Sequence, residues 1–210
     1  MYTELKKTDA ALKQELGDFL RSCFVPSDSI EIRLIETWHE AGHGKSQLVG
    51  RHWITQQELL SSWHPLQRHN ARGANVFFGV NPRRGQGGKK EDVAVCRILW
   101  ADLDNARPED ESIWAAFPKP SLVIDSGRGV HLYWRLSETI ELTTSDNRSH
   151  IEGILKGMYE VLRSDSVQDV TRLLRLPGFL NVKNLRNGQP AELCRIASHD
   201  HRRLYRLSDF

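Results

Sequence analysis

The chain has 210 residues, a formal net charge of +2, 39% hydrophobic residues and 27% charged residues. These values are typical of a globular protein with one sizeable core, and so small a net charge does not by itself indicate a nucleic-acid-binding protein. The three cysteines, Cys23, Cys96 and Cys194, are far apart and form no CxxC pair, so we expect neither zinc nor a disulfide framework. We also expect no membrane contact and a cytoplasmic location, because the sequence shows no signal peptide and no apolar run of membrane-spanning length.

The N-terminal part predicts a helix followed by a long hairpin. Apolar residues at helical spacing predict an amphipathic helix over residues 5–24, and alternating apolar and charged residues predict a half-buried strand over 30–34. Residues 47–53 can pair with that strand. The connecting sequence GHGKS, residues 42–46, resembles a phosphate-binding loop, but that motif needs a glycine where the chain has His39, and no helix-forming run follows. We therefore interpret it as the polar tip of a hairpin.

A second helix and a basic loop follow the hairpin. Thr55 and Glu58 have the spacing of a capping box, which predicts a helix start, and Pro65 should kink or end that helix. Residues 75–80 predict a strand, and residues 81–90 a glycine-rich, basic and mobile loop. This loop is either simply solvated or contacts nucleic acid or a triphosphate, since basic loops commonly bind phosphate oxygens.

The centre of the sequence predicts three strands of one sheet. Short apolar runs at residues 98–101, 121–124 and 130–134 are each bounded by glycine, proline or charged residues. The second and third runs are joined by residues 125–130, a tight and glycine-rich connection that predicts a β-hairpin.

Two aspartates end the first of these strands. Asp102 and Asp104 are two positions apart, so both carboxylates lie on one face of the strand and Leu103 points to the other. At a separation of ~5 Å and an effective dielectric constant of ~20, they repel by roughly 3 kcal/mol, and a divalent cation such as Mg²⁺ is the usual compensation. His131 lies on the neighbouring strand. Taken singly, such a pair can also be a solvated strand end, and such a histidine can be a packed core residue.

The sequence after the hairpin combines a helix with a basic segment. Regular apolar spacing predicts a helix over residues 147–163 that packs against the sheet. Arg172 and Arg175 are three positions apart, so on a helical turn they share one side and suit a polyanion; alternatively they are ordinary surface arginines. Asn181 and Lys183 follow on an extended segment.

The C-terminal part predicts a strand over residues 191–197 and a polar tail. Within the tail, His199-Asp200-His201 with Tyr205 is similar to the histidine motif of rolling-circle nicking enzymes. In that motif the middle residue is apolar and lies in a strand, whereas here it is an aspartate. We therefore expect a solvated tail.

The order of these motifs resembles the archaeo-eukaryotic primase superfamily, especially the primase-polymerases of plasmids, phages and mobile genetic elements. Its first motif is an apolar strand that ends in two acidic residues, here Asp102 and Asp104. Its second is a small residue, any residue and histidine, here residues 129–131. Its third is an aspartate after the following helix, ahead of the sequence TRLLRLPG; Asp165 and Asp169 are both candidates, and we choose Asp169.

The resemblance covers roughly residues 75–185 and implies the fold. We expect an α+β protein whose catalytic lobe, residues 75–210, is an RRM-like antiparallel sheet with a helix over 147–163 on one face. Residues 1–74 should form an N-terminal αβ lobe beside it, and the two lobes together should form a single primase-polymerase domain. A longer protein that carries a helicase or accessory domain is left open.

The resemblance also implies the activity and the site. It implies DNA-templated nucleotidyl transfer, in which primers are made and extended from NTPs or dNTPs on a single-stranded DNA template. Two Mg²⁺ or Mn²⁺ ions ~3.5–4 Å apart would be held by Asp102, Asp104 and Asp169, with His131 at the catalytic centre. The residues implied to contact the nucleotide are Ser126, Arg128, His131, Arg172, Arg175, Asn181 and Lys183.

Two functions of other classes are alternatives. A metal-dependent nuclease or nicking replication initiator could use the same acidic residues, but it would cleave DNA in the absence of nucleotides. A non-catalytic RRM-like nucleic-acid-binding module is the second alternative. The paired carboxylates argue against it, because like charges beside phosphate weaken binding.

Overall fold

The computed structural model describes residues 8–40, 43–163, 169–183, 185 and 188–210. Its α-helices are α1 (Asp9–Cys23), α2 (Gln56–Ser61), α3 (Trp63–Ala71) and α4 (Ser145–Leu162). Its strands are β1 (Ile30–Glu40), β2 (His43–Ile54), β3 (Ala74–Gly79), β4 (Val95–Asp104), β5 (Leu122–Asp125), β6 (Gly129–Glu141), β7 (Leu173–Arg175), β8 (Leu180–Asn181), β9 (Glu192–Leu193) and β10 (Arg195–His199). Short 3₁₀ helices are η1 (Lys90–Asp92), η2 (Glu111–Trp114) and η4 (Leu207–Asp209).

Two four-stranded sheets make up the centre of the described structure. Their strand orders are β2-β1-β3-β7 and β10-β5-β6-β4, and β8 and β9 form a further small sheet. The named strands pair antiparallel. The predicted α+β class with antiparallel sheets is thus confirmed. The motif-bearing strands, however, lie in both sheets, because β7 joins β3 while β4 and β6 pair with each other. The sheets therefore do not divide the chain at residue 75.

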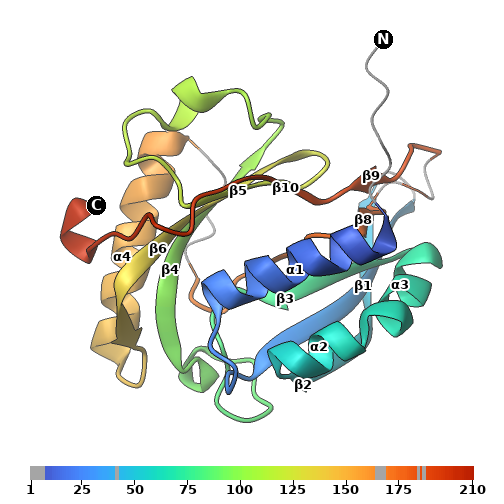
Figure 1. Cartoon of the computed structure of the whole chain (residues 1–210), viewed down its shortest axis with the longest axis horizontal. Helices are drawn as coiled ribbons and strands as arrows, with labels where there is room; N and C mark the ends of the chain where they lie inside the picture. Colours follow the sequence, from blue (N-terminus) through green and yellow to red (C-terminus); the bar gives the residue numbers. More distant parts are fainter. Residues whose placement is uncertain (1–7, 41–42, 164–168, 184, 186–187) are drawn as a thin grey trace.

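Helices cover one face of each sheet (Figure 1). α1, α2 and α3 lie on the β1–β3 sheet, where the rings of Phe19 and Phe24 pack edge-on against Phe78, with centroids 5.2 and 6.1 Å apart. Truncating such a buried ring to alanine costs about 3–5 kcal/mol. The predicted helix α4 packs against β4. None of the helices described here has the length and apolar character needed to cross a membrane.

The break between α2 and α3 differs from the prediction. The capping box is present: the Thr55 hydroxyl accepts from the Glu58 amide, and the Glu58 carboxylate accepts from the Thr55 amide. The helical segment is interrupted at Ser62, which separates α2 from α3, so the predicted kink at Pro65 is wrong. Pro65 instead lies in the first turn of α3, where its missing N–H has no intrahelical partner to lose.

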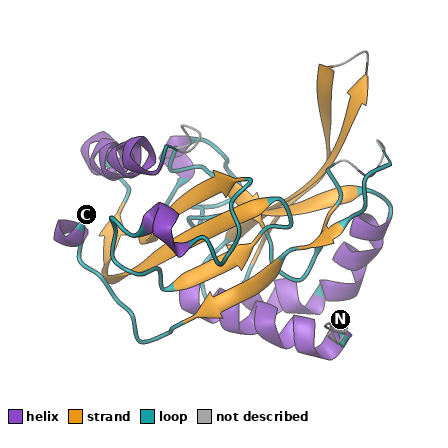
Figure 2. Ribbon diagram, turned by 90° about the horizontal axis from the view of Figure 1, so that it is seen from above, coloured by secondary structure: helices purple, strands orange, loops and turns teal. Residues whose placement is uncertain are grey.

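The β1–β2 hairpin is longer than predicted. Its register runs from Ile30 opposite Ile54 to Glu40 opposite His43. Residues 43–46, expected at a hairpin tip, lie in strand β2, and a phosphate-binding loop is excluded there because such a loop is not a paired strand. β3 pairs with β1 only as far as Glu36. The outer part of the hairpin therefore extends beyond the sheet, as Figure 2 shows from above.

The C-terminal segment packs partly on the second sheet, so the prediction of a solvated tail holds for residues such as His201 and Arg202 but not for His199 and Tyr205. β10 pairs with β5, and His199 belongs to this strand. The His199 Nε2 atom lies 2.8 Å from the Ser22 hydroxyl of α1. Tyr205 donates a hydrogen bond to the Lys119 carbonyl at 2.5 Å. The pairing of β10 with β5 thus fixes His199, which the polar sequence around it had predicted to be in solvent.

Candidate active site

The pairing of β4 with β6 places the central motifs side by side. Asp102 lies directly opposite His131, and Asp104 lies opposite Gly129. Leu103 points to the other face and is buried. A Cβ atom at Gly129 would lie 2.2 Å from the Leu103 carbonyl oxygen, so only glycine permits this approach of the strands. The predicted juxtaposition of the carboxylates and the histidine strand is present.

The hairpin between β5 and β6 is held by its own hydrogen bonds. The amide and the hydroxyl of Ser126 both donate to the Gly129 carbonyl, at 2.9 and 3.0 Å. Gly127 has a φ of +84°, a conformation that favours glycine, and its amide donates to the Asp125 carboxylate at 2.9 Å. The Ser126 hydroxyl proton is therefore engaged within the turn.

Asp102 is bound by an arginine from the third motif. The Arg172 Nη2 atom lies 2.5 Å from Asp102 Oδ2, and His131 Nε2 lies 3.6 Å from Oδ1. Burial would raise the pKa of Asp102, but the charge and hydrogen bond of Arg172 outweigh burial and hold that pKa below its usual range. Asp102 is thus an ionised carboxylate whose counter-charge is a guanidinium.

His131 is almost completely buried, with 1% of its surface exposed. Burial lowers its pKa to about 4, so the imidazole is neutral at physiological pH. Its Nδ1 atom lies 3.5 Å from the Tyr133 hydroxyl. The neutral ring therefore lies between Tyr133 and Asp102, just beyond hydrogen-bond distance of the carboxylate.

A cavity of about 380 Å³ lies beside the carboxylate pair. Its described lining residues are Asp104, Asn105, Arg107, Ser126, Gly127, Arg128, Arg175, Asn181, Lys183 and Glu192. Five of the predicted nucleotide contacts are therefore brought together here: Ser126, Arg128, Arg175, Asn181 and Lys183. Asp102, His131 and Arg172 are not part of this lining. Four basic side chains around one cavity give it the charge that a polyphosphate requires.

Arg172 and Arg175 do not lie on a helical turn, so that prediction is wrong. Arg175 ends strand β7, and Arg172 precedes the strand. The two side chains therefore make different contacts: Arg172 reaches Asp102, whereas the Arg175 guanidinium lies over the Phe77 ring, 5.1 Å from its centroid. The spacing of three residues fits both a helix and a strand end, and the pairing of β7 with β3 decides it.

Asn181 connects the third motif to the hairpin. Its amide donates to the Ser126 carbonyl at 2.9 Å, and its side-chain oxygen accepts from the Lys183 amide at 3.2 Å. Because Asn181 is 1% exposed, its role in the structure is to fix neighbouring segments around the cavity. Arg128 is also oriented, since its Nη1 atom donates to Gln189 at 2.7 Å.

The structure does not bring Asp169 to the carboxylate pair. The Asp169 carboxylate accepts from the Thr171 amide at 2.7 Å and lies 3.8 Å from the Lys90 ammonium group. Within residues that the structure describes, no three histidine, cysteine, aspartate or glutamate side chains are grouped to hold one metal ion. The other candidate, Asp165, lies outside the described residues.

The residues present nevertheless fit a divalent ion held by two carboxylates. Asp102 and Asp104 supply the hard oxygen ligands, and the guanidinium already bound to Asp102 shows that a positive charge is favourable at this position. Magnesium is commonly held by one or two protein carboxylates, with water and substrate phosphates completing its octahedron. The cavity beside Asp104 has room for such phosphates.

Sequence reasoning missed three residues of the cavity, namely Asn105, Arg107 and Glu192. Asn105 and Arg107 lie one and three positions after Asp104. A basic residue so close to the aspartate pair could have indicated a phosphate contact. Glu192 carried no signal, because it reaches the cavity only through the pairing of β9 with β8.

No protein-family model matches the chain. A curated relative, a replication protein of Clostridium perfringens, is 25% identical over 155 residues, which make up 63% of this chain and 37% of the relative. The chain therefore spans less than two fifths of the length of the curated relative that it matches.

Solved structures share the fold at low sequence identity. The archaeo-eukaryotic primase (AEP) domain of the cyanophage S-2L primase-polymerase superposes with a TM-score of 0.68 at 15% identity, over 93% of this chain and 94% of that domain. The primase RepB' gives 0.63 at 15% identity, over 92% and 58%. The catalytic domain of RepB' in complex with initiator DNA gives 0.61 at 15% identity, over 92% and 87%. The chain therefore has the fold of the archaeo-eukaryotic primase domain, which the order of its sequence motifs indicated.

Proposed function

We propose that this protein is a DNA primase-polymerase that joins nucleotides on a single-stranded DNA template. The observation that carries the proposal is the position of the carboxylate pair, Asp102 and Asp104, beside a cavity with four basic side chains. The fold supports it, because the structures that share this fold are primases and a primase-polymerase. One of them, RepB', was solved in complex with initiator DNA.

The cavity would hold the triphosphate of the incoming nucleotide. Arg128, Arg175 and Lys183 supply positive charge around its phosphates, and Asp104 stands at the same cavity. A 3′-hydroxyl attacks the α-phosphorus, a new phosphorus–oxygen bond forms, and the bond to pyrophosphate breaks. Such transfer depends mainly on positioning and charge stabilisation, which a rigid pair of sheets can supply.

The acidic residues would hold the metal ions. Asp102 and Asp104 would hold Mg²⁺ or Mn²⁺, which would lower the pKa of the attacking hydroxyl and stabilise the leaving oxygens. Arg172 must leave Asp102 for this to happen, and the negative charge of the triphosphate is the natural partner for the released guanidinium. His131, neutral and buried, lies beside Asp102, with its Nε2 atom 3.6 Å from Oδ1. Asp169 remains a predicted third ligand whose placement here does not support that role.

Primer synthesis by the purified chain tests the proposal. The reaction contains single-stranded DNA, Mn²⁺ or Mg²⁺, and labelled NTPs or dNTPs, and its products are sized on a gel. We expect products of several nucleotides that need the template, and none from Asp104→Asn. The absence of product with every nucleotide set, from folded protein that binds Mn²⁺, would contradict the proposal.

Two outcomes would favour the alternatives. Cleavage of labelled DNA in the absence of nucleotides would indicate a metal-dependent nuclease or nicking initiator. Tight DNA binding with neither cleavage nor synthesis would indicate a non-catalytic binding module. A helicase or accessory domain as a partner remains a prediction, as do the choice between NTPs and dNTPs and an origin in a mobile genetic element.

A further inference from the structure

One face of the β2-β1-β3-β7 sheet carries a row of basic and aromatic side chains. Arg51 lies opposite Arg33, Arg33 lies opposite Phe77, and Phe77 lies opposite Arg175. Residues directly opposite in an antiparallel sheet project from the same face, so these four side chains form one continuous row across all four strands. We call it the arginine row. At about 4.8 Å per strand step it spans ~14 Å, and its Arg175 end also lines the cavity.

The helices do not cover this face. The residues that alternate with the row, Leu34, Val76 and Leu174, are buried in the core, on the side where α1 packs against Phe78. Arg33 and Arg51, by contrast, keep 26% and 30% of their side-chain surface exposed. The arginine row therefore projects on the side of the sheet opposite the helices.

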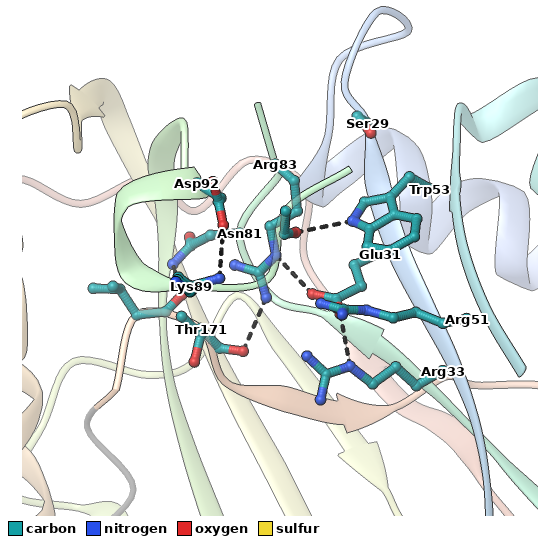
Figure 3. A network of polar contacts seen from close by, with 12 residues as sticks. Ser29, Glu31, Arg33, Arg51, Trp53, Asn81, Arg83, Lys89, Asp92 and Thr171 are labelled. Carbon is teal, nitrogen blue, oxygen red and sulfur yellow. Dashed lines mark hydrogen bonds and ion pairs between the residues drawn. The ribbon is translucent and has the colours of Figure 1, made fainter. Parts of the chain in front are cut away.

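A single buried carboxylate holds three guanidinium groups at one end of the row (Figure 3). Glu31 Oε1 accepts from Arg33 Nε at 2.6 Å and from Arg51 Nε at 2.7 Å, and Oε2 accepts from Arg83 Nε at 2.8 Å. Burial would raise the pKa of Glu31, but its hydrogen bonds and charge contacts with Arg33 and Arg83 outweigh burial and keep the pKa below its usual range. We call these four residues the Glu31 cluster.

The Glu31 cluster carries more positive than negative charge. Three arginines against one glutamate leave an excess of two positive charges, and Arg33 directly opposite Arg51 is a repulsive pair. The buried Nη1 atom of Arg83 has no hydrogen-bond partner among the residues that the structure describes. Such an excess is compensated most simply by an anion outside the protein.

Aromatic rings accompany the arginines. The Arg51 guanidinium lies over the Trp53 ring, 4.5 Å from its centroid, and Arg175 lies over Phe77. Trp53 is itself fixed, because its indole N–H donates to the Gly87 carbonyl of the basic loop 81–90 at 2.9 Å. That loop, predicted to be mobile, is thus tied to the sheet, and its Arg83 is buried. Basic groups interleaved with aromatic rings are the usual platform for single-stranded nucleic acid.

We propose that the arginine row binds the single-stranded template and leads it to the cavity. Phosphates lie on Arg33 and Arg51, a base stacks at Trp53 or Phe77, and Arg175 marks the point where template and nucleotide meet. The proposal rests on the proposed function and adds the path of the template. The cavity already has basic side chains for a triphosphate, so the row is assigned to the strand instead.

Binding of labelled single-stranded DNA, without metal or nucleotide, tests the assignment. Fluorescence anisotropy with a mixed-sequence oligonucleotide of about 20 residues is measured for wild type and for Arg33→Gln/Arg51→Gln over a range of salt concentrations. We expect the double variant to bind about 10-fold more weakly. Its plot of log affinity against log salt should be shallower by about 1.4, the value for two lost phosphate contacts on a single strand.

The matched control removes the same charge from the helical side of the sheet. Arg68→Gln/Arg72→Gln changes two exposed arginines at the end of α3, and we expect affinity within about twofold of wild type. Equal affinity of Arg33→Gln/Arg51→Gln and wild type would overturn the assignment. So would an unchanged DNA affinity combined with a raised KM for nucleotide, because the row would then serve the nucleotide.

A second pair of variants keeps the test valid if the double variant unfolds. Arg51→Gln alone leaves Arg33 and Arg83 on Glu31, and Phe77→Leu keeps apolar volume while removing the ring. Each should weaken binding about threefold, and wild-type affinity in both would overturn the assignment. Because the assay contains neither metal nor nucleotide, template binding by the row would survive even if primer synthesis, and with it the proposed function, failed.

Discussion

Glu31 and Asp102 are both compensated by arginine, and the two sites differ in how firmly the carboxylate is held. Glu31 has no exposed surface and is shared by three guanidiniums, one of them fully buried. The Asp102 side chain is 20% exposed and, among the described residues, forms an ion pair with one arginine, Arg172, beside a neutral imidazole. The Glu31 carboxylate is held firmly (we call it the locked site), because a cation that bound it would have to displace three guanidinium groups. The second is compensated by a single side chain that can leave, which is what a site for an exchangeable cation requires.

The largest effect should come from removing the exchangeable site. We expect Asp102→Asn to lower nucleotide incorporation at least ~1,000-fold, equivalent to ~4 kcal/mol of transition-state stabilisation, because the proposed metal ions would lose an oxygen ligand. The melting temperature should stay within a few degrees, since Arg172 is partly exposed and can be solvated. Primer synthesis and thermal melting are the measurements, with the exposed carboxylate variant Asp146→Asn as control. Incorporation near the wild-type rate would remove the metal-site interpretation.

The locked site should show the opposite pattern. We expect Glu31→Gln to destabilise the fold by about 3 kcal/mol, because three guanidiniums lose the charge that compensates them. For a chain of this length that lowers the melting temperature by roughly 6–12 °C. Urea unfolding measures the free energy, and Glu160→Gln on the exposed face of α4 should change it by less than ~0.5 kcal/mol. A melting temperature equal to wild type would show that the cluster is not structural.

A smaller effect tests whether Arg172 competes with metal. We expect Arg172→Gln to bind Mn²⁺ about 3–10-fold more tightly in the absence of nucleotide, since a positive charge 2.5 Å from Asp102 has been removed. The same variant should use nucleotide less well, with a raised KM. Electron paramagnetic resonance of free Mn²⁺ gives the affinity without any turnover. Weaker Mn²⁺ binding would mean that Arg172 supports the ion instead of competing with it.

The smallest effect concerns the third carboxylate. In the structure Asp169 faces Lys90 and the Thr171 amide, so Asp169→Asn should keep Mg²⁺-dependent incorporation within about threefold of wild type. Asp165→Asn is the matched comparison, because it changes the other candidate by the same atoms. Loss of activity only in Asp169→Asn would restore the predicted three-carboxylate set. Loss only in Asp165→Asn would transfer the role to Asp165.

Local signals predicted the first two motifs well. The strand around residues 98–101, its two carboxylates and the hairpin over 125–130 follow from alternation, charge and glycine within a few positions of each other. The structure confirms all three elements, with β4 ending at Asp104 and β6 beginning at Gly129. Period-two side-chain geometry is a property of the strand itself, so no distant residue was needed to predict it.

Features that depend on strand pairing could not be predicted. Three arginines converge on Glu31 because of distant pairing. The pairing of β1 with β2 brings Arg33 and Arg51 to it, and the loop after β3 brings Arg83 to the same face of the sheet. The helical assignment of Arg172 and Arg175 failed for a related reason: spacing by three does not distinguish a helix from the end of a strand. Residues 173–175 are extended because they pair with the edge of β3, and they form strand β7 there. Tertiary contact overrides local propensity most easily in segments this short.

The pairing of β7 with β3 also fixes the order in which the protein can assemble. Phe77 meets Arg175 across about a hundred residues of intervening chain, so this ladder is a slow, non-local contact. During synthesis, strands β4, β5 and β6 around the carboxylate pair can pair before β7 reaches the edge of β3, and β10 joins their sheet later still. Asp102 then has no guanidinium until the ribosome has released the segment around Arg172. The candidate active site should therefore be among the last parts of the molecule to mature, and formation of the Asp102–Arg172 ion pair should mark a late step of folding.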